Sequence, residues 1–399
     1  MLFRSGFSDR DVEDAAARLM RSRTDCDVTL NVRYVLKTAD SLLQAGHEVA
    51  YDQIVLRKAE PVLFACGSAA VRGEILPRCK ENADRVEFSG RYAFRGTLGE
   101  RLAEWSATFD KKTGALSAYK VGGRNYLAAP LMPCFNRAVT ENDLGAAFHR
   151  KMSIWRNPKF SVEDFRVTVK EHCIEVAVRY APFGEVARVL MTYEVYADGS
   201  ISATESMRDA GRLAMAPPMF RFGMTFAMPG RYSDLDFMGL GPWENYSDRC
   251  SAALLGRYRQ RVEDQYHYGY VRTQESGTHT GLRFFRILDG NRSGLEITCG
   301  REFSASALPF SIADLDVAAL EGDKKEKNHN NQYGVPQHSL ELKARAHGND
   351  RRNGLTHVHF DLVQMGVGGI NSWGRTPMEA YMVPAAERDF HFVIRPVDN

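Results

Sequence analysis

The stretch Val189-Leu190-Met191-Thr192-Tyr193-Glu194-Val195-Tyr196, followed by Ala197-Asp198-Gly199-Ser200, decides the fold class of this chain. Its first eight residues follow a period of two, which is typical of a half-buried strand, and Asp-Gly marks the turn after it. The same pattern recurs over 28–36, 47–56, 165–169, 174–180, 220–226 and 390–394. Repeated short strands with few helical periods predict antiparallel sheets packed face to face.

Composition narrows the class of protein. The chain has 399 residues and a formal net charge of +2, so nothing in its charge favours nucleic acid or a membrane surface as partner. No apolar run approaches the roughly 20 residues that span a bilayer. Seven dispersed cysteines without metal-ligand spacing favour reduced thiols. We therefore expect a cytoplasmic location, or a periplasmic one if a signal lies upstream of this sequence.

A second informative stretch is residues 364–373, QMGVGGINSW. Three glycines within four positions allow positive φ and close approach of the backbone to a ligand or another chain. The bend leads to Trp373, whose broad apolar face and single N–H donor suit stacking on a sugar ring. A tight turn with a half-buried core tryptophan is the other interpretation, and these ten residues leave both open.

Catalytic motifs are missing from the sequence. It contains no P-loop, no dinucleotide-binding glycine motif after a strand, no nucleophile elbow and no H-E-x-x-H. His357 and His359 share one face of a predicted strand, but no third ligand is placed by spacing, so a structural pair is favoured over a metal site. We assign no catalytic and no metal-binding residue to this chain.

Three motifs together resemble one family, the large bacterial β-galactosidases of glycoside hydrolase family 2. Residues 239–249 (GLGPWENYSDR) are similar to its G-L-G-P-x-E-N-Y-x-D-R signature. Residues 136–145 (NRAVTENDLG) resemble its R-A-x-x-D-N-D-x-G loop, and residues 365–373 (MGVGGINSW) resemble its M-G-x-G-G-x-x-S-W segment. The resemblance runs from about residue 28 to the end of the sequence.

The resemblance implies a mainly β fold in two parts. Residues 1–60 are expected to be a partial immunoglobulin-like β-sandwich and residues 61–84 a linker. Residues 85–399 are expected to be a large antiparallel β-supersandwich with a galactose mutarotase-like topology. The catalytic barrel of the family is absent, and with it the two catalytic glutamates and the magnesium and sodium ligands. We therefore expect no cofactor in this chain and no hydrolysis by it alone.

The resemblance also carries over candidate substrate-binding residues. Trp373 matches the tryptophan platform for the incoming galactoside, and Asn142, Asp143 and Gly145 match a mobile loop near the mouth of the active site. Gly145 is the expected hinge of that loop. The chain departs from the family pattern at Glu141 and Ile370, which puts the order of the loops around Trp373 in doubt.

A neighbouring motif calls for a separate prediction. Glu244 and Asn245 are expected to hold their own turn together through hydrogen bonds to backbone rather than to contact substrate. Trp243 occupies the variable position of this motif.

The expected partners follow from the missing barrel. They are a galactoside substrate such as lactose and a catalytic barrel portion, present either in the same long chain or in a separate large subunit. Assembly into a homo-oligomer is a further expectation. Two alternatives stay open: a mutarotase-like epimerase acting alone through His357, His359 and Glu341, and a free-standing carbohydrate-binding module.

Overall fold

The structure is a computed structural model of the chain. It describes residues 10, 13–14, 17–18, 21, 26–61, 63–70, 73–96, 99–316, 339, 342–343, 346, 354–371 and 374–398. The chain divides into two compact units, residues 1–61 and 62–399. Each unit is described by itself.

The first unit contains an antiparallel hairpin of β1 (Val28–Val35) and β2 (Glu48–Arg57). Leu30 lies opposite Ile54 and Tyr34 opposite Ala50, so their side chains share one face of the hairpin. Tyr34 and Ile54 are 39% and 48% exposed. This face therefore carries partly exposed apolar side chains on both sides of the Val32–Asp52 pair, and the immunoglobulin-like interpretation of residues 1–60 stays a prediction.

The second unit consists almost entirely of strands. They are β3 (Arg78–Glu81), β4 (Arg85–Gly96), β5 (Gly99–Asp110), β6 (Leu116–Val121), β7 (Arg124–Asn125), β8 (Ala129–Cys134), β9 (Val162–Val169), β10 (Ile174–Tyr180), β11 (Ala187–Val195), β12 (Ile201–Asp209), β13 (Arg221–Pro229), β14 (Asp234–Gly241), β15 (Leu254–Arg261), β16 (His279–Leu288), β17 (Gly294–Leu308), β18 (Leu355–Gln364) and β19 (Arg388–Val397).

Helices are short in the described part of this unit. They are α2 (Glu141–Gly145), α3 (Phe148–Lys151) and α4 (Ile312–Leu315), with single 3₁₀ turns η1 (Ser153–Trp155), η2 (Leu213–Met215), η3 (Val262–Asp264) and η6 (Glu379–Tyr381). Within the residues that the structure describes, no helix has the length and apolarity needed to cross a membrane.

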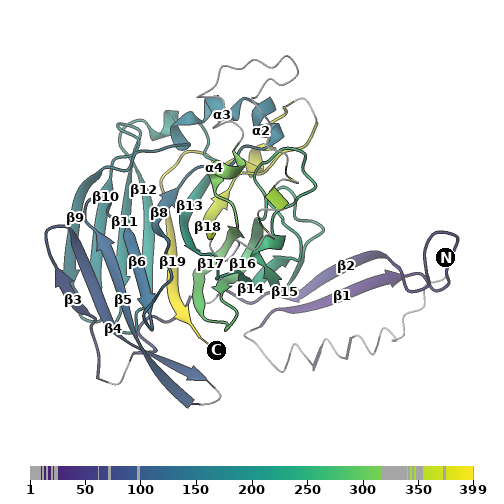
Figure 1. Cartoon of the computed structure of the whole chain (residues 1–399). Coiled ribbons are helices and arrows are strands. Elements are labelled where there is room, and N and C mark those ends of the chain that lie inside the picture. Colours follow the sequence, from purple (N-terminus) through teal and green to yellow (C-terminus); the bar gives the residue numbers. More distant parts are fainter. Residues whose placement is uncertain are drawn as a thin grey trace. The chain divides into compact units, whose positions relative to one another are not determined.

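All strand pairs are antiparallel, which confirms the predicted fold class (Figure 1). The ladder runs β3-β4-β5-β6-β8-β13-β18-β17-β19-β12-β11-β10-β9, and β16, β14 and β15 continue from the other side of β17. The long strand β17 pairs with β19 over its first half and with β18 over its second half. β19 therefore joins the strands β9–β12 to the rest of the ladder.

Two groups of strands pack face to face, as the alternating pattern predicts. Phe109 on β5 meets Tyr193 on β11 edge to face, with ring centroids 5.0 Å apart. The indole N–H of Trp105 donates to the carbonyl oxygen of Ala197 at 3.0 Å, and the Tyr119 hydroxyl donates to that of Gly199 at 2.5 Å. The turn after β11 is thus bonded to the opposite sheet from within the core.

Residues before β4 also contact these sheets. The backbone N–H of Ala69 donates to the carboxylate of Asp198 at 3.1 Å, and Ala70 forms an isolated bridge with Tyr92. The guanidinium of Arg395 lies 3.6 Å from the centre of the Phe64 ring. Most of the segment predicted as a linker, residues 61–84, therefore belongs to the second unit, and it contains strand β3.

The turn residue Gly199 provides a test of this packing. Its φ is +80°, and an added Cβ would lie 2.7 Å from the Trp105 ring. Gly184 has φ +57° with open space around it, so it serves as the matched control. Gly184→Ala should cost about 1–2 kcal/mol of unfolding free energy from backbone strain alone. Gly199→Ala should cost about 3 kcal/mol or more, because the clash adds to the strain. Urea denaturation measures both, and equal losses would contradict the packing described.

Candidate functional site

A glycine-rich loop follows the end of β18. Gly368 and Gly369 have φ of 77° and 101°, and Gly374 beyond them has φ 77°. L side chains rarely adopt this region, so the prediction that glycine permits the bend at positive φ is confirmed. Trp373 lies outside the described residues, and its platform role stays a prediction. The residues around this loop nevertheless define how it is held.

Arg137 fixes the start of the glycine loop. Its buried guanidinium donates to the carbonyl oxygens of Met365 at 2.6 Å and Gly366 at 3.0 Å. Asp143 accepts from the same guanidinium through both carboxylate oxygens, at 2.9 and 3.2 Å. The two buried charges compensate each other and satisfy further polar groups, which is the condition for keeping such a pair in an interior. Removing either partner would leave the other charge buried and unpaired.

The helix α2 brings the predicted residues Asn142 and Asp143 to this loop. Asp143 completes a capping box with Thr140, in which each backbone N–H donates to the other side chain at 3.0 Å. Asp143 is 1% exposed. The side-chain amide of Asn142 donates to the carbonyl oxygen of Val367 at 3.1 Å. Both residues therefore contact the glycine loop, and direct contact with a substrate stays a prediction for them.

Gly145, at the end of α2, is needed for close approach rather than for unusual dihedrals. Its φ lies outside the left-handed region, and an added Cβ would lie 2.8 Å from the Cα of Gly374. A Cβ on Gly374 would in turn lie 2.4 Å from the carbonyl carbon of Gly145. The two glycines thus allow α2 and the chain after the loop to touch, whereas the sequence suggested a hinge.

Asp248 holds the loop from the other side. Its two carboxylate oxygens accept from the backbone N–H groups of Val367 at 3.0 Å and Gly368 at 2.8 Å. A Cβ on Gly366 would lie 2.4 Å from the same carboxylate, so glycine is required there too. Sequence reasoning gave Asp248 no role. The only signal was its position in the motif of residues 239–249.

Asn245 in this motif binds backbone, as predicted. Its amide donates to the carbonyl oxygens of Leu240 at 3.0 Å and Trp243 at 3.1 Å, and its oxygen accepts from the N–H of Thr280 at 3.0 Å. The two bonds from the amide hold the turn together, and the bond from Thr280 joins the turn to β16. Trp243 itself is 75% exposed.

Glu244 binds one backbone group and several side chains. It accepts from the N–H of Gly277 and the hydroxyl of Ser276, both at 2.7 Å, and from Arg249 at 2.6 Å. Burial raises the pKa of this carboxyl, but the hydrogen bonds from Gly277 and Ser276 and the charge of Arg249 outweigh it, and the net pKa is lowered. Glu244 is thus held ionised. Its one backbone bond goes to Gly277, outside its own turn, so the prediction that it holds that turn together through backbone hydrogen bonds is wrong for this residue.

A second buried arginine, Arg221 on β13, is paired with the last residue of β18. Arg221 donates to both carboxylate oxygens of Glu275 at 3.2 Å and lies 3.5 Å from the carboxylate of Asp361. Burial raises the pKa of Asp361 to about 7, with Arg221 opposing the shift and Glu275 adding to it. Gln364 donates to Glu275 at 3.1 Å. This network anchors the last residue of β18 just before the loop begins.

The histidine pair proposed for an epimerase is placed inside the sheet. His359 is 7% exposed, and burial, with the charge of Arg221, holds its pKa well below the ordinary value. Glu341 lies outside the described residues. Among the described residues, no three His, Cys, Asp or Glu side chains are grouped so as to hold a metal ion.

Comparisons with known proteins agree with the motifs. The sequence profile of the "Beta galactosidase small chain" family matches residues 101–394. The chain is 27% identical to a β-galactosidase of Halalkalibacterium halodurans over 91% of this chain and 32% of that protein. It is 30% identical to a β-galactosidase of Lactobacillus delbrueckii subsp. bulgaricus over 75% of this chain and 27% of that protein. The chain thus spans about a third of the length of these relatives.

Solved structures give a weaker likeness. A galactose mutarotase related enzyme of Lactobacillus acidophilus aligns with 77% of this chain and 97% of its own, at a TM-score of 0.35 and 7% identity.

The role of Asp248 is testable in the chain alone. Asp248→Asn removes the charge and one of two acceptors, and hydrogen bonds to charged groups contribute about 1.5–3 kcal/mol. We expect the amides of Val367 and Gly368 to exchange with deuterium about tenfold faster or more, as measured by mass spectrometry. Asp234→Asn, which breaks an exposed pair with Arg261, is the control and should leave this exchange unchanged. Equal exchange in wild type and Asp248→Asn would show that the loop is held otherwise.

Proposed function

The chain belongs to the β-galactosidase small-chain family, and from that premise we propose that it is the C-terminal, non-catalytic part of a β-galactosidase, or its small subunit. One observation carries this proposal: the small-chain profile fits residues 101–394, while β-galactosidase relatives are about three times as long as the matched region. The catalytic residues then belong to the remaining portion. The reaction is hydrolysis of a terminal β-D-galactoside such as lactose.

Within that enzyme, the glycine loop completes the substrate site. The loop is held at three points, by Arg137, Asn142 and Asp248. Such a rigid support is what a binding platform requires, because a loosely held ring gains little from stacking. We propose that Trp373 at the end of this loop receives the galactoside, and that Asn142, Asp143 and Gly145 set its position.

The hairpin of the first unit is evidence that this chain has a partner. A two-stranded hairpin is marginally stable by itself in water. The exposed apolar residues Ile54, Val55 and Leu56 give it a surface that other strands would bury. We propose that strands from the remaining portion complete a sandwich here, and that the assembled enzyme forms a homo-oligomer. The seven cysteines are free thiols, which favours the cytoplasm as its compartment.

Reconstitution tests this function. The purified chain should not cleave a chromogenic β-galactoside, and neither should the Halalkalibacterium halodurans relative truncated before its matching region. Mixing the two, or fusing them, should restore hydrolysis, because each supplies what the other lacks. Hydrolysis by the chain alone would overturn the proposal. If the mixture and the fusion are both inactive although each part is folded by circular dichroism, the proposal also fails.

A single substitution tests the platform in the active assembly. Trp373→Ala should raise KM about tenfold and change kcat by less than about twofold, because the ring acts on the entering sugar rather than on bond cleavage. Trp243→Ala removes an exposed tryptophan from a neighbouring turn and should leave both constants unchanged. A large loss of kcat at constant KM in Trp373→Ala would contradict the platform role.

A further inference from the structure

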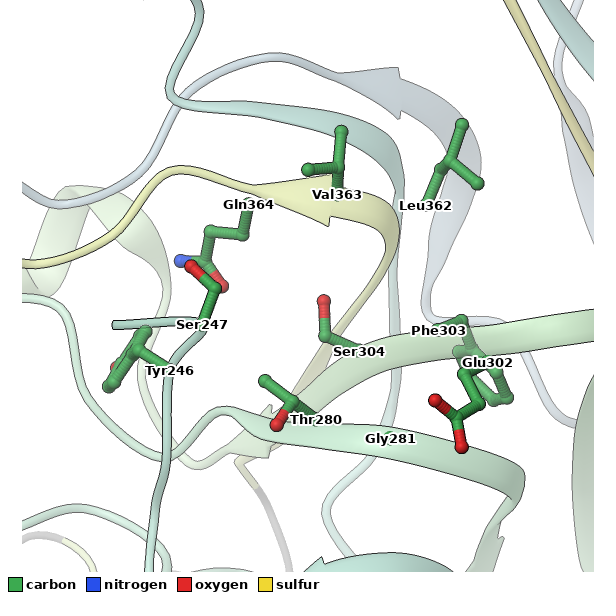
Figure 2. A pocket seen from close by; sticks show the side chains of 10 residues that line it. All are labelled: Tyr246, Ser247, Thr280, Gly281, Glu302, Phe303, Ser304, Leu362, Val363 and Gln364. Atoms are coloured by element: carbon green, nitrogen blue, oxygen red, sulfur yellow. The ribbon is translucent and has the colours of Figure 1, made fainter. Parts of the chain in front are cut away.

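A separate pocket lies where the pairing among strands β16, β17 and β18 is interrupted (Figure 2). The pairing of β18 with β17 ends at Asp361 opposite Ser304, so the last three residues of β18 have no partner on β17. The pairing of β16 with β17 is irregular near the start of β16. Tyr246 and Ser247 close the remaining side. The gap in the ladder leaves a cavity of about 170 Å³.

The pocket has a polar wall and an apolar wall. Ser304, Thr280, Glu302 and Gln364 provide hydroxyl, carboxylate and amide groups, and Leu362 and Val363 provide aliphatic surface. Figure 2 shows the hydroxyl of Ser304 directed toward the strand that carries Leu362 and Val363, with Thr280 and Glu302 on either side of it. This mixture of aliphatic surface and convergent hydrogen-bonding groups is typical of small-molecule sites.

Ser304 places a hydroxyl group in the polar wall of the pocket. The residue is 6% exposed and lies in the pocket wall. A serine hydroxyl can both donate to a ligand hydroxyl and accept from it. Thr280 donates its own hydroxyl hydrogen to Asn245 and keeps acceptor capacity toward the pocket.

The charge of the pocket points to a neutral ligand. The carboxylate of Glu302 lies 3.4 Å from the guanidinium of Arg283, which compensates it. Gln364 has its amide bonded to Glu275 and Thr278. A cation or an anion would therefore meet no uncompensated charge of opposite sign among these groups, whereas hydroxyl groups of a ligand would find both donors and acceptors.

The size of the pocket points to one ring. An engineered cavity of about 150 Å³ binds benzene, so a pocket slightly larger has room for a single six-membered ring. We propose that this pocket binds one neutral monosaccharide, with sugar hydroxyls on Ser304 and Glu302 and the C–H face of the ring against Leu362 and Val363. The site is distinct from the glycine loop, and it does not depend on the proposed hydrolysis.

Saturation-transfer NMR on the full chain tests this site with D-galactose, D-glucose and myo-inositol as probes. At least one of them should give a saturable signal with a dissociation constant on the order of 1 mM to 10 mM. Ser304→Val replaces the hydroxyl with two methyl groups and should weaken that binding at least about fivefold. Leu362→Phe, at a half-buried position on the opposite wall, should weaken it by narrowing the pocket and covers the case in which Ser304→Val does not fold.

Two controls separate this pocket from the rest of the molecule. Ser161→Val replaces an exposed serine elsewhere and should leave the signal unchanged. Binding that persists in Ser304→Val and Leu362→Phe but disappears in Trp373→Ala belongs to the glycine loop rather than to this pocket. The proposal is overturned if none of the three probes gives a saturable signal. It is also overturned if Trp373→Ala abolishes the signal while Ser304→Val and Leu362→Phe retain it.

Discussion

The buried ion pair of Arg137 and Asp143 is the constraint on which the site depends. It joins a short helix, the end of β18 and the loop after it into one hydrogen-bonded unit. The carbonyl groups of Met365 and Gly366 leave the sheet at this point and need donors, which Arg137 provides. A glycine-rich loop would otherwise sample many conformations, because glycine loses the most freedom on ordering.

The charged residues around the Arg137–Asp143 pair share one structural role. Arg137 and Arg221 are both buried, each faces carboxylates, and they flank the same few residues at the end of β18. Asp248 and Glu244 instead accept from backbone N–H groups in turns. The charges in this region therefore fix irregular backbone where the sheet ends. The hydrogen bonds that these charges form offset the free energy lost when the charges are removed from water.

Sequence patterns predicted the parts of this molecule that depend on near neighbours. The period of two identified the strands, the glycines of residues 366–369 indicated the positive φ, and Asn245 was expected to bind its own turn. Long-range contacts left no such signal: Arg137 binds residues 228 and 229 positions away. The requirement for Gly145 also comes from Gly374, which only the folded chain brings against it. The pocket near Ser304 arises because the pairing between β17 and β18 ends there. The alternating sequence pattern of a strand does not show where its pairing ends.

The placement of β19 has a consequence for how the protein is made. Residues 388–397 fill the position between β12 and β17. Until the ribosome has delivered them, the strands β9–β12 lack their connection through the ladder to the strands around β17 and β18, and the edges of β12 and β17 stay open. Such edges pair readily with other chains. Chaperone protection of the nascent polypeptide, and the order in which any separately translated partner docks, would therefore be governed by when these ten residues emerge.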